Sequence, residues 1–314
     1  MIQTRCIEPP EEVGGEQTYG QVVEELASLG RCGRGDSAID RGLQAAGGDI
    51  MTRAFSYGGG VQSTAALVLA ARKEIDFPLF IFANVGDDSE HPDTIDYVRS
   101  VAIPYAARNG VELVTVHGTR KGVKETLLER LRRDRRSVRI PVRLQPSGAV
   151  ARRGCTSDFK ILPIERELRT RGATKENPWT MGMGISFDEL QRMRTDSGSE
   201  RYRIVYPLVD MRLRREDCVR IIERADMPVP PKSSCWFCPF HTLKTWGDLK
   251  RRRPDLFAQA VALEQELSAR SVSIGRGNVH MTDRGPLSHA VGDQIEMNLV
   301  DDDGGACESG YCLV

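Results

Sequence analysis

The sequence has few aromatic residues, no net charge and no long apolar run. Phe, Trp and Tyr make up 6% of its 314 residues, and Lys plus Arg balances Asp plus Glu at 44 each. A balanced charge provides no general attraction to nucleic acid or to a membrane surface. No apolar stretch approaches the roughly 20 residues of a membrane-spanning helix. We therefore expect a protein with no membrane partner.

The sequence also shows neither a secretion signal nor a disulfide scaffold. The segment MIQTRCIEPPEE at residues 1–12 has no apolar core of the kind found in signal peptides. Eight cysteines in 314 residues are too sparse for a disulfide-rich miniprotein. Two of them form a C-x-x-C pair, which in a reducing compartment indicates metal, cluster or redox chemistry. We expect a cytoplasmic protein.

Charge is unevenly distributed along the chain. Residues 1–50 contain nine acidic residues, four Arg and nine of the thirty Gly. This composition indicates a weakly ordered acidic extension or an over-long gene start. We expect a nucleotide-binding α/β domain over residues 51–225. A C-terminal helical region with the C-x-x-C motif and a cysteine-containing tail is expected over residues 226–314.

Apolar segments alternate with segments of helical length. The predicted strands are Arg53–Ser56, 78–85, 111–116 and 180–185. Helices are expected over 63–73, after Pro92 and from Phe187. The run at 78–85 is continuously apolar, as in a sheet that is covered on both faces. The order predicts an α/β fold with a doubly wound parallel sheet, whose ligand lies beyond the carboxyl ends of the strands.

A glycine-rich loop follows the first predicted strand. Tyr57 is followed by GGGVQST at residues 58–64 and then by an apolar helix. Glycines let the backbone approach an anion closely, and the following helix directs free N–H groups at it. The loop lacks the Lys of the Walker A motif. A phosphate-binding loop of another kind and a simple tight turn both remain open.

The segment SYGGGVQST resembles the SGGxDS pyrophosphate loop of the PP-loop superfamily. It is most similar to the branch that contains phosphoadenosine phosphosulfate (PAPS) reductases and the sulfurtransferases of DNA phosphorothioation. Gly58 stands where that pattern has its first Ser, and Gln62 stands where it has Asp. The resemblance implies an adenine nucleotide alpha hydrolase-like fold. It also implies nucleotide contacts by Ser56, Gly58, Gly59, Gly60, Gln62, Ser63, Thr64, Asn84, Gly86 and Asp188.

Further segments extend the resemblance over roughly residues 51–250. They are FANVGDDSEHPDTIDYV (82–98), GCTSDFKILPIEREL (154–168), MGISFDELQRMR (183–194) and YPLVDM (206–211). The second departs from the CCxxRKxxPL pattern of the reductases, because Thr156 replaces a Cys. The third departs from G-I-R-x-D-E/Q, because Ser186 replaces the Arg. The resemblance implies that Lys160 and Arg192 are catalytic cations, which would neutralise charge as pyrophosphate departs.

Cys235 and Cys238 form the C-x-x-C pair, in a proline-rich turn. Thiolates at this spacing fit structural zinc, a dithiol redox pair or an iron–sulfur cluster. The resemblance implies a [4Fe–4S] cluster with Cys155 as the upstream ligand. Its offsets to Lys160 and Pro163 match the family pattern.

The fourth cluster ligand stays open at this point. Cys312 and Cys307 near the C-terminus are spare thiols that could fold back, and we take Cys312 as the leading candidate. Alternatively, the fourth iron position is open, as in cluster-dependent tRNA sulfur transferases. Cys218 lies in a helical pattern and is expected to be a small core residue.

Residues 120–153 carry twelve Lys or Arg against three acids. The stretch LLERLRRDRRSVRIPVRLQ fits an amphipathic helix with a solvated basic face. It also fits a patch that binds the phosphate backbone of tRNA or DNA. The scarcity of aromatic residues gives base stacking no support.

Three functions are compatible with these patterns. The first is sulfur transfer with Mg-dependent ATP, in which a nucleic-acid or nucleotide acceptor is adenylated, pyrophosphate leaves and sulfide then displaces AMP. The second is reduction of PAPS or APS with release of sulfite and with Cys312 as the nucleophile. The tail, however, reads ESGYC (308–312) rather than the reductases' E-C-G-[LI]-H.

The third function is that of a non-catalytic, nucleotide-binding PP-loop relative. We favour sulfur transfer, because the reductase tail motif and the second Cys are missing and because the basic stretch fits a nucleic-acid substrate. This choice implies a sulfur or electron donor protein as a partner. The resemblance also makes a homodimer an expectation.

Overall fold

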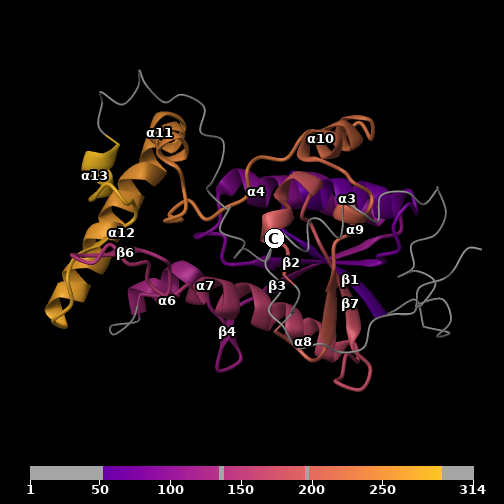
Figure 1. Cartoon of the computed structure of the whole chain (residues 1–314), viewed down its shortest axis with the longest axis horizontal. Helices are drawn as coiled ribbons and strands as arrows, with labels where there is room; N and C mark the ends of the chain where they lie inside the picture. The colour runs from indigo at the N-terminus through magenta and orange to yellow at the C-terminus, as the bar shows by residue number, and fades with distance from the viewer. Residues whose placement is uncertain (1–51, 134–137, 195–197, 292–314) are drawn as a thin grey trace, which may run out of the picture. The chain divides into compact units, whose positions relative to one another are not determined.

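The computed structural model describes residues 52–133, 138–194 and 198–291 (Figure 1). The acidic segment 1–50 lies outside these ranges, as do the candidate thiols Cys307 and Cys312. No helix within them combines the length and the apolar character that crossing a bilayer requires.

The centre of the fold is a five-stranded sheet. Its strands are β1 (Arg53–Tyr57), β2 (Leu79–Asn84), β3 (Glu112–His117), β7 (Trp179–Met183) and β8 (Tyr202–Val205). They lie in the order β3-β2-β1-β7-β8, and every neighbouring pair is parallel. The order reverses its direction at β1, which makes the carboxyl ends of β1 and β7 the expected ligand position. The predicted α/β fold with a parallel sheet is confirmed.

Alternation along the strands supplies both faces of this sheet with apolar side chains. Phe55 and Phe80 pack in a cluster on one face, whereas Ala54 and Ile81 belong to a cluster on the other. All six residues of β2 are buried. A strand that is buried on both sides needs a continuous apolar sequence, which explains the run at 78–85.

Helices cover both faces of the sheet. The first cluster is closed by α3 (Val61–Ala71), α4 (Pro92–Tyr97), the π-helix η2 (Val98–Ala102), α5 (Ile103–Arg108) and α10 (Arg215–Glu223). The other cluster is closed by α8 (Leu162–Thr170). Figure 1 shows α3, α4 and α10 on one side of the strands and α8 on the other. The sheet is therefore doubly wound.

A further hydrophobic core joins residues 127–159 to the C-terminal region. The elements that contribute to it are α6 (Leu127–Arg133), η3 (Ser157–Ile161), α11 (Leu243–Arg252), α12 (Pro254–Ser273), β9 (Val279–His280) and α13 (Leu287–Ala290). Strand β6 (Arg143–Leu144) pairs with β9 in the antiparallel sense. The region that begins at residue 226 thus shares its core with the middle of the chain.

Two helices in the structure differ from those predicted from the sequence. Among the described residues of 120–153, the amphipathic pattern forms the short α6, and Pro141, Pro146 and Gly148 disfavour a helix over 138–150. The segment from Phe187 is a 3-10 helix, η4 (Phe187–Arg192), with a non-helical residue at Glu189. Strand β8 was not predicted from the sequence.

Replacement of Gly182 by Ala tests how tightly the sheet packs. A Cβ at Gly182 would overlap the ring of Phe55 and lie 2.9 Å from Phe77. We expect Gly182→Ala to lower the free energy of unfolding by about 1–3 kcal/mol, the usual cost of overpacking. Gly247→Ala is the matched control, because Gly247 lies inside α11 and a Cβ there meets only the end of Arg251 at 3.5 Å. Urea unfolding should show the control to be neutral or stabilised, and equal losses in both variants would contradict this account.

Candidate active site

The glycine loop ends in the N-terminus of α3. Gly59 has a φ of +77°, and a Cβ there would lie 3.0 Å from Thr94. Gly60 is the N-cap and supplies no side-chain cap, so the first-turn N–H groups of α3 are not capped by a side chain. Gly184, just after β7, packs so closely that a Cβ would lie 3.1 Å from the backbone nitrogen of Ser63. The loop therefore has the geometry of an anion-binding helix N-terminus.

Several predicted nucleotide contacts have internal partners. Ser63 Oγ donates to the carbonyl of Gly60 at 3.1 Å, and Thr64 Oγ1 shares a 2.9 Å hydrogen bond with the hydroxyl of Tyr57. Asn84 Nδ2 donates to Asp87, and Asn84 Oδ1 accepts the N–H of Gly86, both at 2.8 Å. These side chains shape the loop and the turn after β2. Their contact with a nucleotide stays a prediction.

A polar network links the loop to η4. Gln62 Nε2 donates to Glu189 Oε2 at 2.9 Å, and Arg215 donates to Gln62 Oε1 at 3.2 Å. Arg192 donates to the second oxygen of Glu189 at 2.7 Å. The Gln that replaces the loop Asp of the resembled pattern thus holds a carboxylate from another segment.

Arg192 is the most deeply buried cation of this network. Its side chain is 5% exposed, and it lines the same cavity as Gly60 and Gln62. Nε and Nη2 are buried and have no hydrogen-bond partner within the described ranges. A buried guanidinium whose hydrogen-bond donors are not all satisfied is suited to bind an anionic ligand.

Arg215 is a functional candidate that the sequence analysis missed. It is the first residue of α10, and its backbone N–H donates to Asp188 Oδ1 at 3.1 Å. This bond ties Asp188 to the start of α10, and Asp188 does not line the cavity. The basic pair Arg214-Arg215, which follows the YPLVDM segment after two intervening residues, was the available signal.

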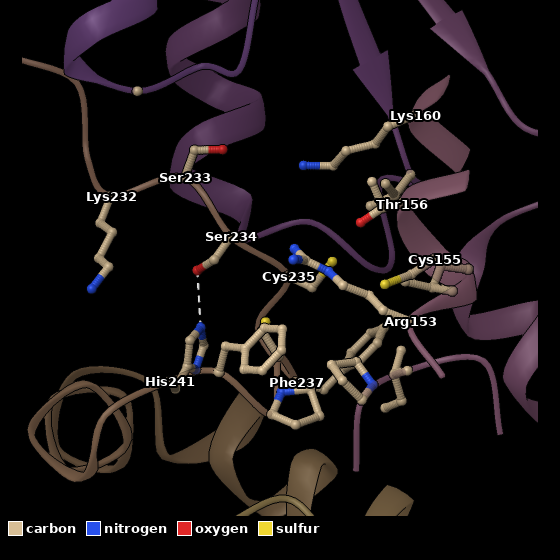
Figure 2. Close-up of a pocket in the computed structure, with 18 of the residues that line it drawn as sticks. Arg153, Cys155, Thr156, Lys160, Lys232, Ser233, Ser234, Cys235, Phe237 and His241 are labelled. Carbon is tan, nitrogen blue, oxygen red and sulfur yellow. Dashed lines mark hydrogen bonds between the residues drawn. The ribbon is translucent and has the colours of Figure 1, made fainter. Parts of the chain in front are cut away.

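Cys155, Cys235 and Cys238 line one cavity. Cys155 lies in the short helix α7 (Gly154–Thr156), and the C-x-x-C turn is held at Cys235 by a β-bridge to Glu90. Figure 2 shows Cys155 and Cys235 in the same part of the cavity, with the side chain of Arg153 running toward Cys235 in this view. The structure therefore places the three predicted ligands on the lining of one cavity, while Cys218 is buried in α10.

The donor set fits an iron–sulfur cluster. Three thiols from two separate segments face one cavity, and sulfur is the ligand atom of such clusters. Among the described residues, no three His, Cys, Asp or Glu side chains form a ready group around a single metal ion. No fourth cysteine of the described ranges lines the cavity.

Burial and neighbouring charges shift the pKa values of Cys235 and His241 in the cavity. Burial raises the pKa of Cys235 well above its usual range, the nearby Glu90 and the other two cysteines raise it further, and Lys160 acts in the opposite direction. Burial lowers the pKa of His241 to about 3, so this imidazole is neutral. Its Nε2 shares a 2.9 Å hydrogen bond with Ser234 (Figure 2).

The cavity unites the loop, the polar network and the cysteines. Its volume of about 500 Å³ lies within the range of small-molecule sites. Glu189 is the one carboxylate among the described residues that line it. The lining cations are Arg153, Lys160, Arg192, Arg215 and Lys232. The excess of positive charge is suited to a ligand with several negative charges.

Some of the arginines after residue 120 pair with nearby acids. Glu125 accepts hydrogen bonds from Arg130 at 2.7 Å and from Arg133 at 2.9 Å. Asp158 lies 3.4 Å from Arg130 and 3.7 Å from Arg139. These ion pairs neutralise part of the predicted basic patch.

The chain is similar to known proteins at the level of solved structures. No family model and no curated protein matches it. A PAPS reductase from Candida auris, in a phosphate complex, is 15% identical with a TM-score of 0.40, over 69% of this chain and 92% of the other. The U34-tRNA thiolase NcsA from Methanococcus maripaludis, with its [4Fe-4S] cluster, is 15% identical with a TM-score of 0.40, over 68% and 71%.

Arg192→Gln tests the anion site. Loss of charge-assisted hydrogen bonds worth about 1.5–3 kcal/mol should weaken ATP binding by about 10- to 100-fold in calorimetric titration. Arg203→Gln removes an exposed cation from β8 and should leave ATP affinity unchanged. Equal affinity of wild type and Arg192→Gln, with both proteins folded by circular dichroism, would rule out this role.

Glu125→Gln tests the buried ion cluster through pH. Burial raises the pKa of Glu125, but the hydrogen bonds from Arg130 and Arg133 outweigh it and hold the pKa below its usual range. The stabilisation is thus present above the ordinary pKa near 4.5 and is lost as pH falls below it. We expect the free energy of unfolding of the variant to be about 1–3 kcal/mol below that of the wild type at neutral pH, with a smaller difference in acid.

Urea titrations over the acid range measure this difference. The control Glu74→Gln removes a half-exposed carboxylate 4.0 Å from Arg72 and should change stability little at any pH. If the difference in free energy of unfolding between wild type and Glu125→Gln stayed constant as pH falls, the proposed ion pairs of Glu125 with Arg130 and Arg133 would be contradicted.

Proposed function

We propose that this protein is a PP-loop enzyme that uses ATP to activate an acceptor for sulfur transfer, with a [4Fe–4S] cluster beside the nucleotide. One observation carries the proposal: the glycine loop, the buried Arg192 and the three cysteines line the same cavity. The order of five family-like segments along the chain supports the same assignment.

The phosphate end of the site is built from the loop and η4. The N–H groups at the start of α3 and the free nitrogens of Arg192 would bind phosphate oxygens. Arg215 would hold Gln62 in place through its hydrogen bond. Glu189 supplies the carboxylate available to a Mg²⁺ ion on the phosphates.

The chemistry of this end is nucleotidyl transfer. An acceptor oxygen would attack the α-phosphorus of ATP, the bond to the β-phosphate oxygen would break, and pyrophosphate would leave. Lys160 and Arg192 would neutralise the charge that develops on the leaving group, which lowers the barrier most inside a cavity with restricted water. The products of this step are an adenylated acceptor and pyrophosphate.

Cys155, Cys235 and Cys238 would hold the cluster as thiolates. When bound, the cluster would supply iron, and an iron without a fourth protein ligand would be able to carry sulfur. Burial raises the pKa of Cys235 well above its usual range, and Lys160 offsets part of this rise toward the thiolate form that ligation requires. Cys312 is the proposed fourth ligand from outside the described residues, with an open iron position as the alternative.

The proposal is tested on anaerobically purified protein. We expect bound iron and sulfide, and pyrophosphate release from ATP that increases when tRNA or DNA is added. Cys235→Ser should lose most of the iron, because one of the three shared ligands is removed. Cys218→Ala, a change at a buried cysteine outside the cavity, should keep it.

Other outcomes separate the competing functions. Sulfite release from PAPS with a thiol donor would replace sulfur transfer by sulfonucleotide reduction and would point to Cys312 as the nucleophile. Nucleotide binding without turnover of ATP or PAPS would favour the non-catalytic relative. Zinc in place of iron, with no nucleotide turnover, would overturn the proposed function.

A further inference from the structure

A short β-hairpin projects from the chain directly after β3. Its strands are β4 (Thr119–Arg120) and β5 (Val123–Lys124), which pair in the antiparallel sense. Lys121 and Gly122 have φ values of 49° and 81°, as the tight type I′ hairpin turn requires. In Figure 1 the hairpin extends beyond the neighbouring helices α7 and α8.

The hairpin is strongly basic and carries an exposed apolar side chain. Arg120, Lys121 and Lys124 are exposed, and residues 118–124 contain no acid. Val123 is 70% exposed, the largest value among the large apolar side chains of the described ranges. It pairs with Arg120, so both side chains lie on one face of the ribbon.

The acids near its base do not cancel this charge. Glu125, the next residue along the chain, is bound by Arg130 and Arg133. Asp87 at the end of β2 is bound by Arg99 at 2.7 Å, and Lys124 is a weaker electrostatic partner of the same carboxylate. The hairpin therefore keeps an excess of exposed positive charge.

The base of the hairpin is firmly attached close to the cavity. Glu125 donates its N–H to the carbonyl of Gly118 at 3.0 Å, and a Cβ at Gly118 would collide with the ring of Phe159. Two residues further on, the N–H of Leu127 bonds to the carbonyl of Val85 at 2.8 Å. Leu127 and Val85 both line the cavity. The base of the hairpin is thus anchored to segments that line the cavity.

We propose that this hairpin docks in the major groove of double-stranded DNA. A two-stranded ribbon fits the roughly 12 Å width of that groove, where apolar side chains can contact thymine methyl groups. The major groove of an RNA duplex is too narrow and deep for such an element. Arg120, Lys121 and Lys124 would neutralise backbone phosphates, while Val123 contacts base edges. The inference goes beyond the proposed function, which would also accept a nucleotide or an RNA.

Fluorescence anisotropy with a labelled DNA duplex tests the docking. A triple variant, Arg120→Gln with Lys121→Gln and Lys124→Gln, removes the charge but keeps side chains of similar length. Each phosphate contact contributes about 0.9 to the slope of log affinity against log salt, so the slope should fall in magnitude by about 2.7. The variant should keep the iron content and the ATP affinity of the wild type.

The control removes three exposed arginines from other elements: Arg108→Gln, Arg203→Gln and Arg284→Gln. It should bind DNA with nearly the wild-type slope. The inference is overturned if the control loses as much as the hairpin variant, if an RNA duplex of the same sequence binds equally well, or if the wild type binds no duplex DNA. A wild-type protein that lacks iron and does not bind ATP would contradict the proposed function. The anisotropy measurement would still show whether the hairpin binds DNA.

Discussion

The candidate site depends on a hydrophobic core that joins two distant parts of the chain. Trp236 and Phe237, inside the C-x-x-C motif, are buried with Leu127, Ile140 and Phe159. Burial of these side chains is the driving force that holds the C-terminal helices against residues 127–159. Cys155 and Cys235 are 80 positions apart in sequence, and this packing is what gives them a common cavity.

The sequence predicted the sheet and the site to different degrees. Strand β2 was found because a strand buried on both faces must be apolar throughout. Strand β8 is short and only half buried, so its pattern carried too little signal. Arg215 was missed because its role arises only when α10 packs beside α3 and brings it to Gln62. Contacts between elements that are distant in the chain cannot be predicted from the local periodicity of the sequence.

The many arginines of this chain serve two physical purposes. Arg130, Arg133 and Arg139 neutralise Glu125, which lies just before α6, and Asp158 in η3. In the cavity, by contrast, five cations surround a single carboxylate within the described residues. Sequence composition cannot distinguish arginines that neutralise acids from arginines that line a cavity, because both kinds occur in Arg-rich segments. Only the structure shows which cations face the cavity and which lie on the exposed hairpin at residues 119–124.

The replacement of the loop Asp by Gln62 is the main departure from the resembled motif, and the structure gives it a physical explanation. Gln62 is buried, and an Asp there would place a second negative charge beside Glu189. Two carboxylates at hydrogen-bond distance repel each other and cannot both stay ionised without compensation. A neutral amide instead donates to Glu189 and accepts from Arg215. The carboxylate is therefore supplied by η4 rather than by the loop, and a negative group is still present where the glycine loop lines the cavity.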